Sequence, residues 1–258
     1  ERPVVFKASV DQRGGSNSGS ALLSFYINGI RGAQKSLSVS NGNKTEEFTV
    51  NLKEAGLLEV KAELEDDALI ADNTAYSAVF VPSEIKILLV SKYSRDSEYL
   101  KLLLDNAFEP GFINIDEIDA GRLPARDLSL YNAVIICSPE AGSVSENLIS
   151  YLNSNGSLMV LPGEKTSAKD ISEFFGRAGV KLYAEIYNAD SGNISSLVFE
   201  KTETNHPLFN DIFNNKEKGR IDSPEFFVNF NIKTDYPHVK IITLNNNYPF
   251  LAEFNKES

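Results

Sequence analysis

Cys137 is the residue best suited to covalent chemistry, since it is the single thiol of a chain with two histidines. It ends a buried apolar strand expected over residues 132–137, at the sheet edge where α/β proteins bind ligands. A thiol nucleophile also needs a histidine base and backbone N–H groups that hold the oxyanion. Pro139 has no N–H, and neither His206 nor His238 has an acidic partner at triad spacing. We therefore predict no catalytic residues. Cys137, His206 and His238 are expected to have structural roles.

Polar side chains follow this strand and the next one. Ser138 and Glu140 come directly after the first strand, and Glu164 follows a second apolar strand expected over Ser157–Leu161. With Asp119, the two glutamates can gather at the carboxyl edge of the sheet and bind a cationic ligand or a metal. Solvated loop acids are the alternative. We predict ligand-binding positions at Ser138, Glu140, Ser143 and Glu164, without a metal or a cofactor.

Two further groups of residues could bind ions or phosphates, but their spacing indicates structural roles instead. Asp66, Asp67, Asp72 and Asn73 do not have the spacing of an EF-hand loop, so we expect a turn that seats Tyr76. The turn over residues 91–94 contains no glycine, which excludes a dinucleotide site or a P-loop there. Lys92 and Arg95 can meet an anion at the start of the following helix, or can simply be solvated.

The bulk properties exclude several partners. The net charge is -11 and the pI is near 4.8, which disfavours nucleic acid because the summed field repels polyanions. A single cysteine excludes an internal disulfide and a paired-cysteine metal site. No apolar run approaches about 18 residues, so we expect no direct membrane insertion by these residues. The abrupt ends suggest a piece of a longer protein whose membrane anchors lie outside it.

A strand, helix and strand over residues 128–164 position the candidate site. Ser143 and Glu146 have the spacing of a capping box, and Val144, Leu148, Ile149 and Leu152 form an apolar stripe on the helix. Because both strands are continuously apolar, they suit a parallel sheet that is covered on both faces. Residues 83–258 are therefore expected to form an α/β domain, truncated at its end. Its other expected helices are 95–108, which buries Tyr99, Leu100, Leu103, Leu104 and Ala107, and 168–178, which is capped by Ser167. Its other expected strands are 85–90, 114–118, 180–185, 196–199, 227–230 and 239–244.

Residues 1–82 are predicted to form an immunoglobulin-like β-sandwich. Short segments with alternating apolar and polar residues are separated by turn sequences such as GGSNSGS and NGNK. The cysteine pair and the tryptophan of antibody domains are absent. The expected strands are Pro3–Val10, Ala21–Ile27, Lys35–Ser40, Glu46–Leu52, Leu57–Leu64 and Thr74–Val81.

Two stretches resemble a known family. EDDALIADNTAYSAVFVPSEIKILLV is similar to the domain junction of bacterial membrane proteins of the Bat (aerotolerance) type. YNAVIICSPEAG and LISYLNSNGSLMVLPGE, together with NHPLF at 205–209, resemble the second domain of those proteins, which is similar to class I glutamine amidotransferases. The resemblance covers roughly residues 55–258. It implies a flavodoxin-like second domain and a periplasmic or cell-surface location, membrane-anchored in the full-length protein.

The resemblance implies no established reaction, since these membrane proteins are not known for one. The nucleophile position of the amidotransferases falls near residues 162–164, where there is neither Cys nor Ser. We therefore expect a non-catalytic extracytoplasmic binding or assembly module with a protein partner. A cysteine-dependent hydrolase or amidase that uses Cys137 is one alternative. A small-ligand sensor at the carboxyl edge of the sheet is another.

Overall fold

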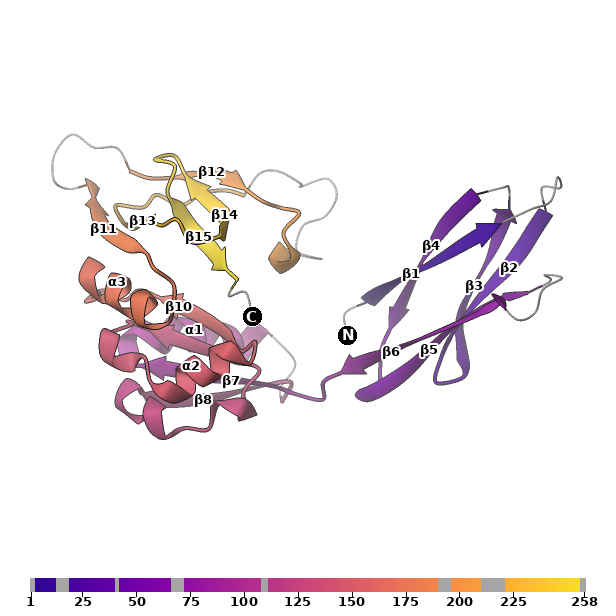
Figure 1. The fold of residues 1–258 in the computed structure, drawn as a ribbon, viewed down its shortest axis with the longest axis horizontal. Coiled ribbons are helices and arrows are strands. Elements are labelled where there is room, and N and C mark those ends of the chain that lie inside the picture. Colours follow the sequence, from indigo (N-terminus) through magenta and orange to yellow (C-terminus); the bar gives the residue numbers. More distant parts are fainter. Residues whose placement is uncertain are drawn as a thin grey trace. The chain divides into compact units, whose positions relative to one another are not determined.

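The computed structural model describes residues 3–12, 19–39, 42–65, 72–107, 111–189, 196–209 and 221–255. The chain divides into two compact units, Glu1–Glu84 and Ile85–Ser258 (Figure 1). The predicted boundary, between residues 82 and 83, lies close to this division. Each unit is described by itself.

Two antiparallel sheets make up the first unit. In one sheet, β1 (Pro3–Gln12) pairs with β4 (Gly42–Asn51). The other has the order β3-β2-β5-β6, from β3 (Ile30–Val39), β2 (Gly19–Ile27), β5 (Gly56–Glu65) and β6 (Thr74–Val81). Each of the six predicted strands is present, because alternating apolar and polar side chains suit strands with one buried face.

Aromatic side chains from both sheets meet in one core. The ring of Phe25, on β2, lies 5.0 Å from that of Phe6 on β1 and 5.2 Å from that of Phe48 on β4. Leu23, Leu37 and Val60 are buried in the same cluster. The two sheets therefore pack face to face as a β-sandwich.

The second unit is built on a parallel four-stranded sheet. Its strands are β7 (Ile85–Ser91), β8 (Ile113–Asp119), β9 (Ala133–Cys137) and β10 (Ser157–Leu161), in the order β10-β9-β7-β8. Both faces of the central strands are buried, which explains their unbroken apolar sequences. The predicted strand–helix–strand unit with parallel strands is confirmed.

Helices cover both faces of this sheet (Figure 1). On one face, α1 (Ser94–Ala107) packs Leu100 and Leu104 against the cluster around Ile87 and Leu89. On the other face, α2 (Glu146–Asn153) and α3 (Ala168–Arg177) contribute Leu148 and Phe174 to the largest core cluster. Two 3₁₀ helices, Ala120–Ala125 and Leu128–Leu130, complete that layer.

The predicted buried face of α1 is partly wrong. Tyr99 is 82% exposed and Leu103 is 61% exposed, whereas Leu100 and Leu104 do pack on the sheet. Apolar residues occur on two sides of this helix, so its periodicity alone does not indicate which side meets the sheet. Ser97 is fully buried, and its single O–H is shared between Glu117 Oε1 of β8 and the Ser94 carbonyl, each 3.0 Å away.

The two predicted helix caps have different outcomes. The N-cap of α2 is Ser145, and Ser143 lies buried in a short 3₁₀ turn, Ala141–Ser143, so the predicted capping box is wrong. Ser167 does cap α3, in a capping box with Asp170. The α3 helix ends at Arg177 with Ala178 as its C-cap, and the next residue, Gly179, has a φ of 93°, a conformation that favours glycine.

Two small antiparallel sheets follow α3. One pairs β11 (Tyr183–Asn188) with β13 (Val228–Lys233), and the other has the order β12-β14-β15, from β12 (Phe199–Thr202), β14 (His238–Leu244) and β15 (Pro249–Phe254). The predicted strands over 180–185, 196–199 and 227–230 are displaced by a few residues. The first of these, β11, begins three residues later than predicted because Val180 and Leu182 pack with Ile171 of α3 before the strand begins.

Candidate functional site

The turns that follow β9 and β10 meet at the carboxyl edge of the parallel sheet. Ser138 has a φ of 56°, and its hydroxyl donates to the carboxylate of Asp96, near the start of α1. A Cβ atom at Gly163 would overlap both of these side chains. The Gly163 N–H donates to Thr166 Oγ1 over 2.9 Å. The hydroxyl of Ser138, a predicted ligand-binding group, is thus engaged within the protein.

The predicted carboxylates at this edge are separately paired. Lys92 donates to Glu140 over 2.6 Å, and this hydrogen bond raises the pKa of the Lys92 ammonium. Glu164 lies 3.9 Å from Arg95, and both side chains are exposed. Asp119 instead accepts from the Gly121 N–H and caps a 3₁₀ helix. In the part of the chain that the structure describes, no group of three or more metal-ligating side chains is found.

Cys137 is buried, with 1% of its surface exposed. Burial, followed by the charges of Asp96 and Glu117, raises the pKa of the thiol from 9.0 to about 11. A group with this pKa is almost entirely protonated near neutral pH, whereas nucleophilic cysteines have a depressed pKa. The environment of Cys137 is therefore that of a core residue.

The two histidines belong to the antiparallel part of the unit. His206 Nε2 lies 2.6 Å from a carboxylate oxygen of Glu253. His238 stacks on the ring of Phe254 at a centroid distance of 5.6 Å, with Nδ1 2.9 Å from the Tyr236 carbonyl. Among the described residues, no hydrogen bond joins either histidine to Cys137. The structure therefore does not bring together a cysteine–histidine pair.

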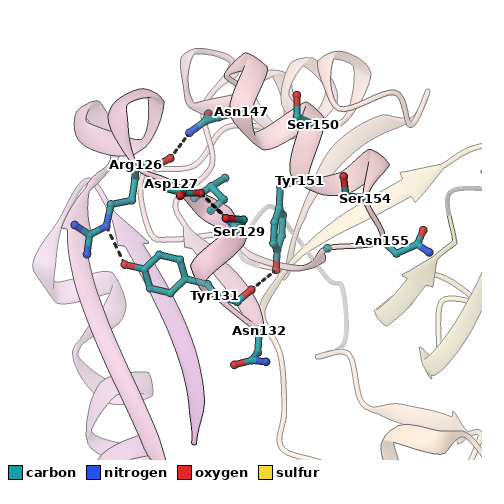
Figure 2. Close-up of a pocket in the computed structure, with 12 residues that line it drawn as sticks. Arg126, Asp127, Ser129, Tyr131, Asn132, Asn147, Ser150, Tyr151, Ser154 and Asn155 are labelled. Atoms are coloured by element: carbon teal, nitrogen blue, oxygen red, sulfur yellow. Dashed lines mark hydrogen bonds between the residues drawn. The ribbon is translucent and has the colours of Figure 1, made fainter. Parts of the chain in front are cut away.

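An open cavity of about 580 Å³ lies at the opposite, amino-terminal edge of the sheet. Figure 2 shows that its walls come from the segment that leads into β9, the outer side of α2 and the turn before β10. The lining residues are mostly uncharged and polar: Arg126, Asp127, Leu128, Ser129, Tyr131, Asn132, Asn147, Ser150, Tyr151, Ser154, Asn155 and Gly156.

Hydrogen bonds fix one wall of this cavity. Arg126 Nε donates to the Tyr131 hydroxyl over 2.8 Å, and both side chains donate to Asp116 on β8. The hydrogen bond from Tyr131 and the guanidinium of Arg126 lower the pKa of the Asp116 carboxyl. Burial and the bond to Asp116 raise the pKa of Tyr131. Arg126 and Asp116 neutralise each other, whereas Asp127, which accepts from the Ser129 N–H and hydroxyl, leaves a carboxylate charge on this wall.

The opposite wall is formed by α2 and its C-terminal turn. Asn147 Nδ2 donates to the carbonyls of Leu123 and Arg126, each over 2.8 Å, and so ties the helix to the preceding loops. Tyr151 donates to the Ser157 carbonyl over 3.2 Å. Its hydroxyl also lies 3.5 Å from the Tyr131 carbonyl oxygen (Figure 2). A Cβ atom at Gly156 would overlap the Tyr151 ring, so glycine is required there. The cavity surface is partly apolar and partly polar, and its polar groups can form hydrogen bonds with a ligand.

This cavity was not predicted from the sequence. Its residues precede the strands, whereas the general rule for α/β proteins directs attention to the residues that follow them. The run Asp127–Asn132 carries the only sequence signal, a group of polar side chains ahead of a buried strand.

The predicted acidic loop of the first unit is only partly described, because Asp66 and Asp67 lie outside the described residues. The Asn73 carbonyl accepts from the Leu64 N–H over 2.8 Å, as expected for a turn that closes a hairpin. Tyr76 is 67% exposed, so the prediction that this turn seats its side chain is wrong.

No protein-family model and no curated protein matches the chain. Among solved structures, it is similar to the CARDB domain of a Pyrococcus furiosus protein, crystallised in complex with di-metal ions. The identity is 20% and the TM-score 0.29, over 31% of this chain and 74% of that one. A TM-score this low supports no conclusion about fold or function. No helix among the described residues is long and apolar enough to cross a membrane. The resemblance to Bat-type proteins and to amidotransferases stays a prediction from the sequence.

Proposed function

We propose that this chain is a non-catalytic binding or assembly module that recognises a protein partner through the outer face of α1. In this proposal an immunoglobulin-like sandwich is joined to a flavodoxin-like domain. The order β10-β9-β7-β8 supports the second part, because numbering the strands by appearance gives 2-1-3-4 from the β8 edge, as in the flavodoxin order. The extracytoplasmic, membrane-anchored location rests on the sequence resemblance to Bat-type proteins alone.

The observation that carries the proposal is an exposed apolar stripe on α1, formed by Tyr99, Leu102 and Leu103. Their exposed fractions are 82%, 61% and 61%. Positions i, i+3 and i+4 lie on one side of a helix, so the three side chains are neighbours. A monomeric protein rarely exposes several large apolar side chains together on a regular helix, and tyrosine is enriched in interfaces. Arg95 and Asn106 continue the same side with polar groups.

A non-catalytic role is supported by the environment of Cys137, the candidate nucleophile. Cys137 is buried and its pKa is raised, and the two histidines have partners in another part of the unit. A cysteine-dependent hydrolase would need a thiolate accessible to substrate and a base within hydrogen-bond reach. These requirements disfavour the hydrolase alternative.

Site-specific photo-crosslinking tests the proposed surface. A photoreactive aromatic residue at position 99 should give one discrete adduct with a protein in extracts of the source cells. Leu102→Ser and Leu103→Ser, introduced beside it, should abolish the adduct while the fold is retained. The same group at Lys169, an 80% exposed side chain on α3, is the matched control. Identical adducts from positions 99 and 169, or none from position 99, would remove the basis of the proposal.

A small-ligand sensor is the second candidate function, and the cavity at the amino-terminal edge favours it. Its volume of about 580 Å³ is within the usual range for small-molecule sites. The carboxyl-edge residues Ser138, Glu140 and Glu164 already have partners, which a ligand there would have to displace. A ligand screen by NMR should perturb the amides of Ser129, Ser150 and Ser154 if the cavity binds it. Perturbations confined to other surfaces would reject this candidate.

A further inference from the structure

We propose that the free edge of β10 pairs with β10 of a second copy of this chain, antiparallel and about a two-fold axis at Met159. The two parallel sheets would then join into one continuous sheet. This inference concerns a different surface from the α1 stripe. It stands whether or not that stripe binds a partner.

The backbone of β10 has one paired side and one unpaired side. β10 is the end strand of its sheet, and in the described part of the chain it pairs with β9 alone. The Ser138 N–H donates to the Leu161 carbonyl over 2.8 Å, so the backbone groups of Leu161 face β9. Because backbone groups alternate along a strand, those of Met159 face β9 too, whereas those of Leu158 and Val160 face outward. Within the described ranges, no hydrogen bond reaches these outward groups.

The two edges of the same sheet are protected very differently. The β8 edge has the sequence INIDEID, with Asp116, Glu117 and Asp119 along it. The β10 edge has the sequence SLMVL, which contains no charge and no proline. Natural proteins guard free edges with charges, prolines or covering elements, because an unguarded edge pairs with other strands. An apolar edge without such protection is thus expected to be covered by another strand.

The edge is complementary to itself. In an antiparallel pair centred on Met159, Leu158 lies opposite Val160 of the second copy, and Val160 lies opposite Leu158. Opposite residues whose backbone groups face each other exchange two hydrogen bonds. The pairing therefore satisfies the outward N–H and C=O groups of Leu158 and Val160 in both copies. Met159 would face its own counterpart in the close, non-hydrogen-bonded position. Its side chain is 43% exposed and lies on the same sheet face as Ile135, its register partner, so the contact would also bury apolar surface.

Disulfide trapping tests both the pairing and its register. Under mild oxidation, Met159→Cys should form a linked dimer, since directly opposite Cα atoms lie within disulfide range. Ser157→Cys is the matched control on the same strand and should not link. Its counterpart would be displaced by four residues, or about 13 Å, which a disulfide cannot span. The buried Cys137 is present in both variants and in the parent chain.

Sedimentation of the unmodified chain supplies an independent measurement. The parent chain should show concentration-dependent dimers, and Met159→Lys should raise the dissociation constant at least tenfold by placing two charges at the axis. Tyr183→Lys, a 58% exposed position on β11, should leave association unchanged. Linkage through position 157, a monomer at every concentration, or equal association of the parent and Met159→Lys would each overturn the proposal. Protection of the Leu158 and Val160 amides from exchange in a monomer would show that another segment covers the edge, which also overturns it.

Discussion

The hydroxyl of Ser138, directly after β9, donates a hydrogen bond to the carboxylate of Asp96, near the start of α1. This contact joins the turn after β9 to the start of α1 at the carboxyl edge of the sheet. It is possible only because Gly163, after β10, has no side chain. The residues predicted to bind a ligand there instead connect three elements of the fold.

Gly163→Ala should destabilise the protein. The added Cβ atom would overlap Ser138 and Asp96, and overpacking of this kind costs about 1–3 kcal/mol of unfolding free energy. Urea unfolding at neutral pH measures the change. Gly176→Ala is the control, because a Cβ at this helical glycine meets no atom within 4 Å and should stabilise α3 by about 0.5–1 kcal/mol. Equal effects of the two substitutions would show that the overlap does not matter.

Cys137 should react with thiol reagents only after unfolding. It is buried, and its pKa in the folded protein is about 11 against 9.0 for a free thiol. Because the folded state holds this proton more tightly, the contribution of Cys137 to stability is complete below about pH 9. It is lost as the pH rises towards about 11. The unfolding free energy of the parent chain should therefore fall more steeply over this window than that of Cys137→Ala. Rapid labelling of the folded chain near neutral pH would contradict the core assignment and favour the hydrolase alternative.

Tyr131→Phe should cost about 1 kcal/mol at neutral pH, because it removes the hydroxyl that donates to Asp116. The pKa of Asp116 is lowered in the folded protein. The stability that depends on its charge is thus present above the ordinary aspartate pKa and is lost as the pH falls through the lowered value. The difference between parent and variant should shrink in acid. Unfolding curves at neutral and acidic pH, with a parallel titration of the Asp116 carboxyl by NMR, check both statements. A difference that is independent of pH would show that the carboxylate is not involved.

Leu103→Ala and Leu104→Ala should differ although the residues are adjacent. Leu103 is 61% exposed, so its truncation should change stability by less than about 0.5 kcal/mol. Leu104 packs against the sheet, and its truncation should cost about 2 kcal/mol. Thermal or urea unfolding separates the two. A large loss from Leu103→Ala would mean that the exposed stripe on α1 is part of a core.

Local sequence determined much of the fold. The strands of the first unit and β7, β9 and β10 were predictable from their apolar patterns. A strand buried on one face alternates apolar and polar residues, whereas a strand buried on both faces is continuously apolar. The Ser167 cap of α3 was predictable for the same reason, since a capping box involves only four consecutive residues.

Tertiary structure decided what local pattern leaves open. Helix α1 has apolar residues on two sides, and only its position on the sheet selects Leu100 and Leu104 for burial. Ser145, and not Ser143, is the N-cap of α2, because a 3₁₀ turn occupies the preceding residues.

The candidate site depends most on contacts between distant residues. Ser138 and Asp96 are 42 positions apart, and Asn147 donates to carbonyls 21 and 24 positions away. Which polar groups pair with each other, and which remain available to a ligand, follows from how the strand ends and loops pack. Residue types and spacing therefore indicate where polar groups occur along the chain, whereas their partners are set by the packed sheet.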